Sequence, residues 1–192
     1  MAPLSRKTKD RDNPTSHPQG ILHLHGVLVD VFGVGVLIVG RSGIGKSECA
    51  LELVMRGHRL VADDLICLER SPEGKLYGYG EELGRYLMEI RGLGIVDIEK
   101  LFGVAATRPR KRIHLVIELV DQGGEVMDRT GLERRKWEAL GVELPLRRIP
   151  VTPGRNLSII VEVAARNFLL EERGMRAPEE LDRRLRQRMG ES

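Results

Sequence analysis

The sequence has few aromatic residues, few cysteines and no long apolar run, and each shortage excludes a class of protein. Aromatic residues make up 4% of the 192 positions, which leaves little stacking surface for single-stranded nucleic acid. The two cysteines, Cys49 and Cys67, form no CxxC pair, so a cytosolic protein without disulfides is the default expectation. No apolar stretch reaches the roughly 18 residues of a transmembrane helix, and no apolar segment follows the basic N-terminus as in a secretory signal. We therefore predict a cytoplasmic protein that binds neither nucleic acid nor membrane.

The composition that is present suits one soluble α/β domain. Apolar residues make up 41% of the chain, glycine occurs 22 times, and the formal net charge is +3. The mild positive charge suits phosphate ligands or an acidic partner protein. Residues 1–20 are polar and contain three prolines without an apolar period, which predicts a disordered N-terminal segment. The folded domain is expected to span 21–192.

Apolar periodicity predicts a mixed sheet with flanking helices. Strands are expected at 27–31, 35–39, 59–62, 65–69, 76–79, 113–120 and 144–151. Helices are expected at 48–56, 98–102, 134–140, 156–172 and 178–189, with Asp97 and Asn156 as N-caps. Several neighbouring strands are joined by short turns, so the fold class is α/β with antiparallel pairs, not a uniform βαβ alternation.

One motif carries a specific chemical prediction. Residues 40–47, Gly40-Arg41-Ser42-Gly43-Ile44-Gly45-Lys46-Ser47, match G-x-x-x-x-G-K-[ST] between a predicted strand and a predicted helix. The glycines let backbone N–H groups face phosphate oxygens, and the helix N-terminus adds positive potential. Lys46 is suited to neutralise β- and γ-phosphates, and the Ser47 hydroxyl to ligate Mg²⁺. The motif predicts binding of a nucleoside triphosphate or another polyphosphate, but P-loops serve many reactions.

Acidic residues near this loop point to phosphoryl transfer. Asp63 and Asp64 end the predicted strand that follows the P-loop helix, where a carboxylate can hold Mg²⁺ or accept a proton from a hydroxyl. Adjacent side chains of a strand point in opposite directions, so only one of the two is expected to face the phosphates. The alternative is that the pair marks a turn.

Four further residues are weaker candidates when each is considered alone. His25 precedes the hairpin that leads into the P-loop, and Glu89 lies in a glycine-rich apolar run. Both have structural or surface alternatives. Arg129 and Arg155 lie in glycine-containing turns, where a guanidinium can reach phosphate oxygens, although most arginines in such places are surface residues.

The ordered series of motifs is more specific than any single member. The series is HGVLVD at 25–30, GRSGIGKSE at 40–48, RLVADD at 59–64, MEIRGLGIVDI at 88–98, DRTGL at 128–132 and VTPGRN at 151–156. From about residue 25 to about residue 173, the chain closely resembles the C-terminal catalytic domain of bacterial HPr kinase/phosphorylase.

The resemblance implies a bifunctional enzyme. Such enzymes phosphorylate a serine of the phosphocarrier protein HPr with ATP or pyrophosphate. In the reverse reaction, inorganic phosphate attacks phosphoserine-HPr and pyrophosphate forms. The implied fold is a P-loop core similar to phosphoenolpyruvate carboxykinase, and the implied assembly is a homohexamer.

The resemblance also implies roles for individual residues. Asp64 would be the base that takes the serine proton, with Asp63 supporting it, and His25, Lys46 and Arg129 would complete the catalytic set. Ser47 and Glu89 match the Mg²⁺ ligands.

Two segments are tied to the direction of the reaction. Arg91 lies in the 88–97 segment that serves both directions, and Arg155 lies in the 150–155 segment linked mainly to dephosphorylation. Thr152 departs from the family pattern, because many members have arginine there. Two other functions stay open: a P-loop kinase with another protein or small-molecule acceptor, and a module that senses ATP without catalysis.

Overall fold

The computed structural model describes residues 15–16, 20–121 and 134–189. Its strands are β1 (Thr15–Ser16), β2 (Ile21–Val31), β3 (Val34–Val39), β4 (Arg59–Arg70), β5 (Leu76–Gly80), β6 (Leu87–Ile90), β7 (Gly94–Asp97), β8 (Lys111–Arg112), β9 (Leu115–Asp121), β10 (Arg135–Ala139) and β11 (Val142–Val151). Its α-helices are α1 (Lys46–Met55), α2 (Ile98–Phe102), α3 (Leu157–Glu172) and α4 (Ala177–Met189), with single 3₁₀ turns η1 (Glu82–Gly84) and η2 (Val104–Ala106).

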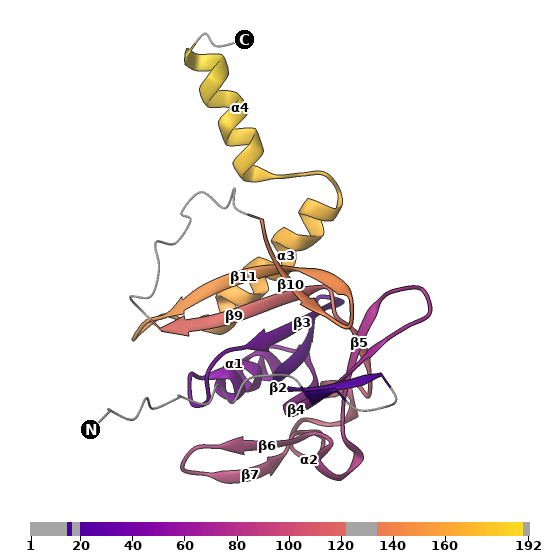
Figure 1. The fold of residues 1–192 in the computed structure, drawn as a ribbon. Coiled ribbons are helices and arrows are strands. Elements are labelled where there is room, and N and C mark those ends of the chain that lie inside the picture. The colour runs from indigo at the N-terminus through magenta and orange to yellow at the C-terminus, as the bar shows by residue number, and fades with distance from the viewer. Residues whose placement is uncertain (1–14, 17–19, 122–133, 190–192) are drawn as a thin grey trace, which may run out of the picture.

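The main sheet is mixed, as the sequence predicts. Its strand order is β10-β11-β9-β3-β2-β4-β5-β8, and β1 pairs with β2 outside this path. Strand β9 runs parallel to both β3 and β11, whereas the other pairs are antiparallel. Strands β6 and β7 form a separate hairpin below the main sheet in Figure 1.

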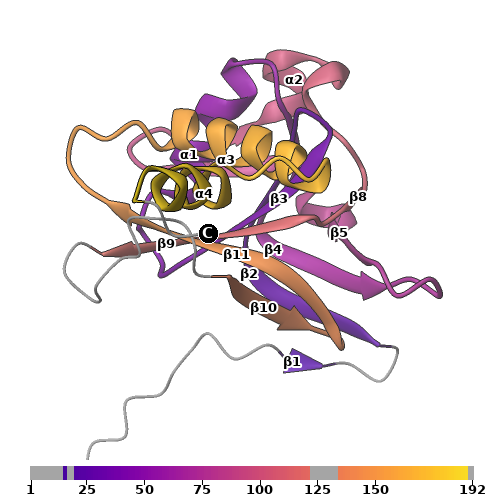
Figure 2. The ribbon, with the colours of Figure 1, turned by 90° about the horizontal axis from the view of Figure 1, so that it is seen from above.

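Two apolar clusters bury the two faces of this sheet. One joins alternate residues of β2 and β3, such as Val29 and Val36, to Leu53 of α1 and Val161 of α3. Helices α1 and α3 therefore lie together against one face, as Figure 2 shows. The other cluster includes residues from both ends of the strand order, Leu76 of β5 and Leu144 of β11 among them, so the sheet curls around it.

Most of the predicted elements are confirmed. The hairpin of β2 and β3, the helices α1 to α4 and the strands β5, β9 and β11 occur where the periodicity places them, within a few residues. The caps are confirmed too, because Asp97 accepts from the Lys100 N–H (3.0 Å) and Asn156 from the Ile159 N–H (3.0 Å).

The helix expected at 134–140 is wrong, because these residues form strand β10. Burial alternates along the strand, with Trp137 and Ala139 inward and Lys136 and Glu138 exposed, which is a period of two. Leu140 and Gly141 both have positive φ angles, 51° and 69°, and this is the backbone of a tight hairpin turn. Pairing with β11 therefore outweighs the helix propensity of the segment.

The strand expected at 59–62 begins where predicted but is longer than predicted. Strand β4 continues through Asp63 and Asp64 to Arg70, because it pairs along its whole length with β2. A bulge between Leu28 and Val29 shifts the register shortly before the two aspartates. The pair therefore lies inside a long strand and not at its end.

The predicted N-terminal segment 1–20 is described only at Thr15–Ser16, which pair with β2, and at Gly20. The remaining residues of that segment lie outside the described residues. Within the described part of the chain, no helix is both long and apolar enough to cross a membrane.

A close backbone approach at Gly35 gives a stability prediction. A Cβ atom at this position would lie 1.9 Å from the Arg112 carbonyl oxygen, which is backbone and cannot rotate away. We expect Gly35→Ala to lower the free energy of unfolding by about 3 kcal/mol or more, at the upper end of overpacking costs. Urea unfolding measures this loss. Gly84→Ala is the matched control, because nothing lies within 4 Å of its Cβ position, and a change above about 0.5 kcal/mol is not expected there.

Candidate active site

The P-loop joins β3 to α1 in a shape that only glycine readily allows. Gly43 and Gly45 have φ angles of 76° and 103°. A Cβ atom on Gly40 would lie 2.6 Å from the Leu119 carbonyl oxygen of β9. Among the described residues, no side chain caps the first turn of α1, so its N–H groups face the loop as an anion site requires.

Two basic side chains of the loop point in different directions. The Lys46 ammonium donates to the carbonyls of Gly40 (2.8 Å) and Arg41 (3.0 Å), which holds it across the loop. The Arg41 guanidinium instead forms a two-pronged ion pair with Asp121 at the end of β9 (2.5 and 2.7 Å). These bonds lower the pKa of the Asp121 carboxyl. Lys46 is therefore the loop side chain placed to meet phosphate.

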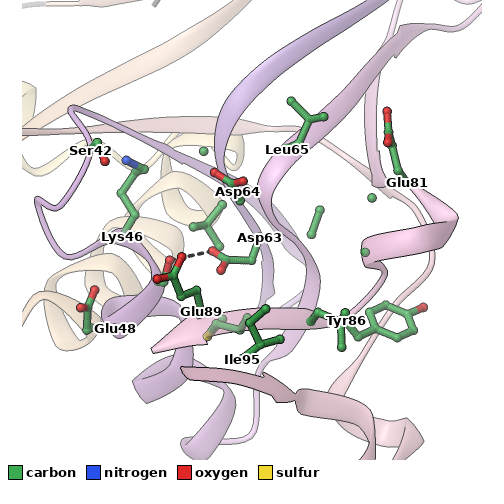
Figure 3. A pocket seen from close by; sticks show the side chains of 18 of the residues that line it. Ser42, Lys46, Glu48, Asp63, Asp64, Leu65, Glu81, Tyr86, Glu89 and Ile95 are labelled. Carbon is green, nitrogen blue, oxygen red and sulfur yellow. Dashed lines mark hydrogen bonds between the residues drawn. The ribbon is translucent and has the colours of Figure 1, made fainter. Parts of the chain in front are cut away.

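A cavity of about 570 Å³ opens beside the loop (Figure 3). Of the eight motif residues, five line it, namely Ser42, Gly43, Gly45, Lys46 and Ser47. Ile44 is buried in the core, where its side chain anchors the loop. Five carboxylates also line the cavity, from Glu48, Asp63, Asp64, Glu81 and Glu89, against two cations, Lys46 and Arg91. Such an excess of carboxylates suits a cation bound together with a polyphosphate.

Asp63 is half-buried on β4 and faces the start of α1. Its carboxylate accepts a hydrogen bond from the Ser47 hydroxyl at 2.9 Å. Burial raises the pKa of Asp63 to about 6, and the neighbouring Asp64 charge adds to the rise, while the Ser47 bond opposes it. Burial thus disfavours the charged carboxylate more than the Ser47 bond and the nearby Lys46 charge favour it, and a divalent cation bound beside it would favour the charged form.

Asp64 breaks the strand alternation that the sequence predicts. Its φ angle is 66°, in the left-handed region, although it lies within β4 opposite Gly26 of β2. Both Asp63 and Asp64 line the cavity, so the regular alternation on which the expectation of a single facing carboxylate rested does not hold at this pair. Backbone strain of this kind is typical of functional sites.

The Asp64 side chain is exposed and contacts the imidazole ring of His25. Its Oδ1 lies 3.1 Å from Nδ1 of His25, whose side chain is 63% exposed and is not among those that line the cavity. This contact joins two residues that are 39 positions apart in the sequence. A carboxylate in contact with an imidazole and open to solvent is accessible to a hydroxyl on another molecule.

The β6–β7 hairpin supplies the opposite wall. Met88 is 1% exposed and packs in the core cluster, so its neighbour Glu89 points the other way, into the cavity. Arg91 follows at the turn and reaches over the P-loop, with a guanidinium nitrogen 3.2 Å from the Cβ position of Gly43. The sequence-predicted Glu89 and Arg91 are thus brought to the phosphate loop.

The oxygen donors fit a hard divalent cation. Ser47, Asp63 and Glu89 offer one hydroxyl and two carboxylates in the same cavity, which are the ligand types that Mg²⁺ prefers. Figure 3 shows Asp63 and Glu89 on facing sides of one space.

Two predicted arginines are not part of this cavity as described. Arg129 lies outside the described residues. Arg155 lies in the turn after β11 and donates to the Pro150 carbonyl at 3.2 Å, and it is not among the residues that line the cavity.

Sequence reasoning missed Glu81, Glu48 and Asp121. Glu81 follows β5 and enters the cavity through strand pairing, which leaves no local motif. Asp121 ends β9, parallel to the strand that leads into the P-loop. The end of a strand beside the P-loop strand is a signal that could have pointed to it.

The raised pKa of Asp63 gives a prediction about pH. Because its folded-state pKa of about 6 exceeds the ordinary 3.8, the folded protein binds more protons than the unfolded chain between these values. The free energy of unfolding should therefore fall as pH rises from about 4 to about 6. Asp63→Asn has no proton to lose in this range, so its free energy of unfolding should not fall with pH in this way. At pH 7 it should exceed that of the parent by about 1–2 kcal/mol.

Urea unfolding at several pH values measures the effect of Asp63→Asn. Asp121→Asn is the control, because the pKa of Asp121 is lowered. Its carboxylate stabilises the folded protein above the ordinary pKa, and this stabilisation is lost as pH falls. The pH dependence expected for Asp121 is therefore opposite to that of Asp63. Equal stability of Asp63→Asn and the parent at pH 7 would show that Asp63 is not desolvated.

Three comparisons relate the chain to known proteins. The family model described as the HPr Serine kinase C-terminal domain matches residues 20–185. The HPr kinase/phosphorylase of Chloroherpeton thalassium is 54% identical over 168 residues, covering 87% of this chain and 49% of that protein. The HPr kinase/phosphorylase of Geobacillus thermodenitrificans is 57% identical over 163 residues, covering 84% and 53%. The chain thus spans about half the length of the curated relatives that it matches.

A solved structure agrees with these matches. The Hpr(Ser) kinase/phosphatase from Coxiella burnetii superposes with a TM-score of 0.74 at 36% sequence identity, covering 79% of this chain and 93% of that one. The mixed sheet with flanking helices is therefore a fold already seen in a relative.

Proposed function

Because the chain belongs to the family of HPr serine kinase C-terminal domains, we propose that residues 21–192 form a bifunctional HPr kinase/phosphorylase domain. It transfers a phosphoryl group from ATP or pyrophosphate to a serine of HPr, and it reverses the transfer with inorganic phosphate. The observation that carries this proposal is the meeting of the P-loop with Asp63 and Asp64 in one cavity. Residues 1–20 are proposed to lie outside the folded domain.

In the kinase direction, the chain's own residues bind the donor and move one proton. The loop N–H groups and Lys46 hold the β- and γ-phosphates, and Arg91 approaches the same loop from the β6–β7 hairpin. The Asp64 carboxylate accepts the proton of the serine hydroxyl as the serine oxygen bonds to the γ-phosphorus. The bond from the γ-phosphorus to the bridging oxygen breaks, and ADP leaves, or phosphate when pyrophosphate is the donor.

In the phosphorylase direction the same groups act in reverse. An oxygen of inorganic phosphate, held by the P-loop, attacks the phosphorus of phosphoserine. The bond between phosphorus and the serine oxygen breaks, the protonated Asp64 returns its proton to that oxygen, and pyrophosphate remains in the loop. His25 stays within 3.1 Å of Asp64, where it orients the carboxylate in both directions.

The Mg²⁺ ion of this proposal is held by Ser47 and Glu89 with support from Asp63. When bound, it neutralises charge on the transferring phosphates. Arg129 and Arg155 are proposed to contribute further positive charge toward HPr or phosphate. The domain is further proposed to assemble as a homohexamer in the cytoplasm.

Labelled ATP distinguishes this function from its alternatives. With γ-labelled ATP and purified HPr, the proposal expects label on a serine of HPr. Label on another protein or small molecule but not on HPr would identify a P-loop kinase with a different acceptor. Binding of ATP without transfer to any acceptor would identify a sensing module, and either result contradicts the proposal.

A further inference from the structure

Three potential metal ligands of different chemistry converge beside the phosphate cavity. His23 of β2, Cys67 of β4 and Glu81 after β5 place one donor atom each within 4.8 Å of one another. The His23 Nδ1 atom lies 3.8 Å from the Cys67 sulfur and 3.5 Å from the Glu81 carboxylate. Both distances exceed those of strong hydrogen bonds, so the three atoms surround a common point without closing on one another.

The two separations from His23 Nδ1 are close to the edges of a zinc coordination tetrahedron. Zn²⁺ bonds of about 2.0–2.1 Å to nitrogen and oxygen and about 2.3 Å to sulfur place two ligand atoms about 3.3–3.6 Å apart. The two distances from His23 Nδ1, 3.8 Å to sulfur and 3.5 Å to oxygen, exceed that range by a few tenths of an ångström at most. The Cys67 sulfur and the Glu81 carboxylate lie within 4.8 Å of each other, and rotation of the half-exposed Glu81 side chain would bring this third donor onto the same ion.

Strand pairing holds two of the ligands rigidly. His23 and Cys67 are direct cross-strand partners of β2 and β4, so their side chains leave the same face of the sheet. Tyr79 pairs with Cys67 on the other side, which brings the end of β5 and Glu81 to the same place. His23 and Cys67 are therefore held in place by the sheet before any ion binds, and Glu81 follows the neighbouring strand.

The burial of the ligands resembles an open metal site. Cys67 is 4% exposed and the His23 side chain 20%, whereas the Glu81 side chain is 52% exposed. The sulfur and the imidazole form the floor, and the carboxylate side opens to solvent, where water can fill a fourth position. Glu81 also lines the phosphate cavity, so the two sites share one wall.

From this geometry we propose that His23, Cys67 and Glu81 form a second metal site, selective for Zn²⁺ and other soft transition metals. The site differs from the Mg²⁺ site by its donors, because a thiolate and an imidazole favour Zn²⁺ while Ser47, Asp63 and Glu89 offer only oxygen. Binding releases the thiol proton of Cys67 to solvent and forms one metal–sulfur bond.

Cobalt titration tests the site with a signal that oxygen ligands do not give. The protein, kept reduced with a non-thiol reductant and in excess Mg²⁺, is titrated with Co²⁺. We expect a thiolate-to-cobalt charge-transfer band that saturates at one equivalent and that Zn²⁺ abolishes. Co²⁺ binding without such a band would overturn the proposal, because it would place the ion among carboxylates.

Variants assign the ligands. Cys67→Ser should abolish the band, and His23→Gln and Glu81→Gln should each weaken Zn²⁺ binding by at least about 100-fold, as measured by competition with a chromophoric chelator. Cys49→Ser is the matched control and should keep the band, since Cys49 lies in α1, buried in the apolar cluster that joins α1 and α3 to the sheet. Glu81 is half-exposed, so Glu81→Gln is expected to fold even if Cys67→Ser does not. An unchanged Zn²⁺ affinity in Glu81→Gln, or loss of the band in Cys49→Ser, would contradict the assignment.

Discussion

Asp64→Asn is expected to reduce phosphoryl transfer to HPr by about 10²–10⁴-fold, the usual contribution of a general base. Asparagine keeps the size of the side chain but cannot accept the serine proton. Asparagine also tolerates the left-handed backbone at this position, where φ is 66°. The loss would therefore report on chemistry and not on the fold, which Asp64→Ala would confound with backbone strain.

Steady-state rates measure the loss of transfer in Asp64→Asn, and the ATP affinity shows whether the donor still binds. The dissociation constant for ATP should stay within a few-fold of the parent, because the Asp64 side chain contacts His25, whereas the loop N–H groups and Lys46 are the groups proposed to hold the phosphates. The free energy of unfolding should also be close to that of the parent. A transfer rate in Asp64→Asn equal to that of the parent would exclude Asp64 as the proton acceptor.

Lys46→Met is expected to have the second large effect, a fall in kcat/KM of about 10²–10³-fold or more, as for removal of one preorganised donor to a developing negative charge. Methionine retains most of the apolar stem of the side chain but removes the ammonium that the loop carbonyls hold. Both ATP and pyrophosphate should be affected, because the ammonium meets phosphate and not the nucleoside.

Lys136→Met is the matched control for Lys46→Met. Lys136 lies on β10 at the end of the main sheet, 63% exposed and paired with Glu143. An exposed ion pair of this kind contributes little to stability, so kcat/KM should not change. An equal fall of kcat/KM in Lys136→Met and Lys46→Met, with ATP and with pyrophosphate, would contradict the assignment of the P-loop as the phosphate site.

The P-loop could be predicted because its chemistry is local. Eight consecutive residues contain the glycines, the lysine and the hydroxyl, and their function depends on backbone geometry that the glycines themselves allow. The caps Asp97 and Asn156 were predictable for the same reason, since each side chain bonds an N–H three residues on. Local chemistry of this kind does not depend on distant partners.

The aspartate pair shows what a sequence does not contain. The positive φ angle of Asp64 and the bulge between Leu28 and Val29 arise where β2 and β4 pair, and the two adjacent carboxylates line one cavity. Strand alternation alone predicts only one. In the same way, β10 is a strand because Trp137 and its neighbours pair with β11, which outweighs their local propensity.

Glu81 was not predictable from its own neighbourhood. It reaches the phosphate cavity and the cluster with His23 and Cys67 only because β5 pairs beside β4. No motif connects these three positions along the chain. The fold class, the loop and most site residues therefore follow from sequence, whereas the walls of the cavity follow from long-range pairing.

Transfer of one labelled phosphoryl group through a full cycle tests the central claim most directly. The protein is incubated with γ-labelled ATP, Mg²⁺ and HPr, the labelled HPr is isolated, and fresh protein is added with unlabelled inorganic phosphate. We expect label first on a serine of HPr and then in pyrophosphate, with both steps slower in Asp64→Asn. Label that never enters HPr, or that leaves it as inorganic phosphate and not pyrophosphate, would contradict a reversible phosphoryl-transfer site.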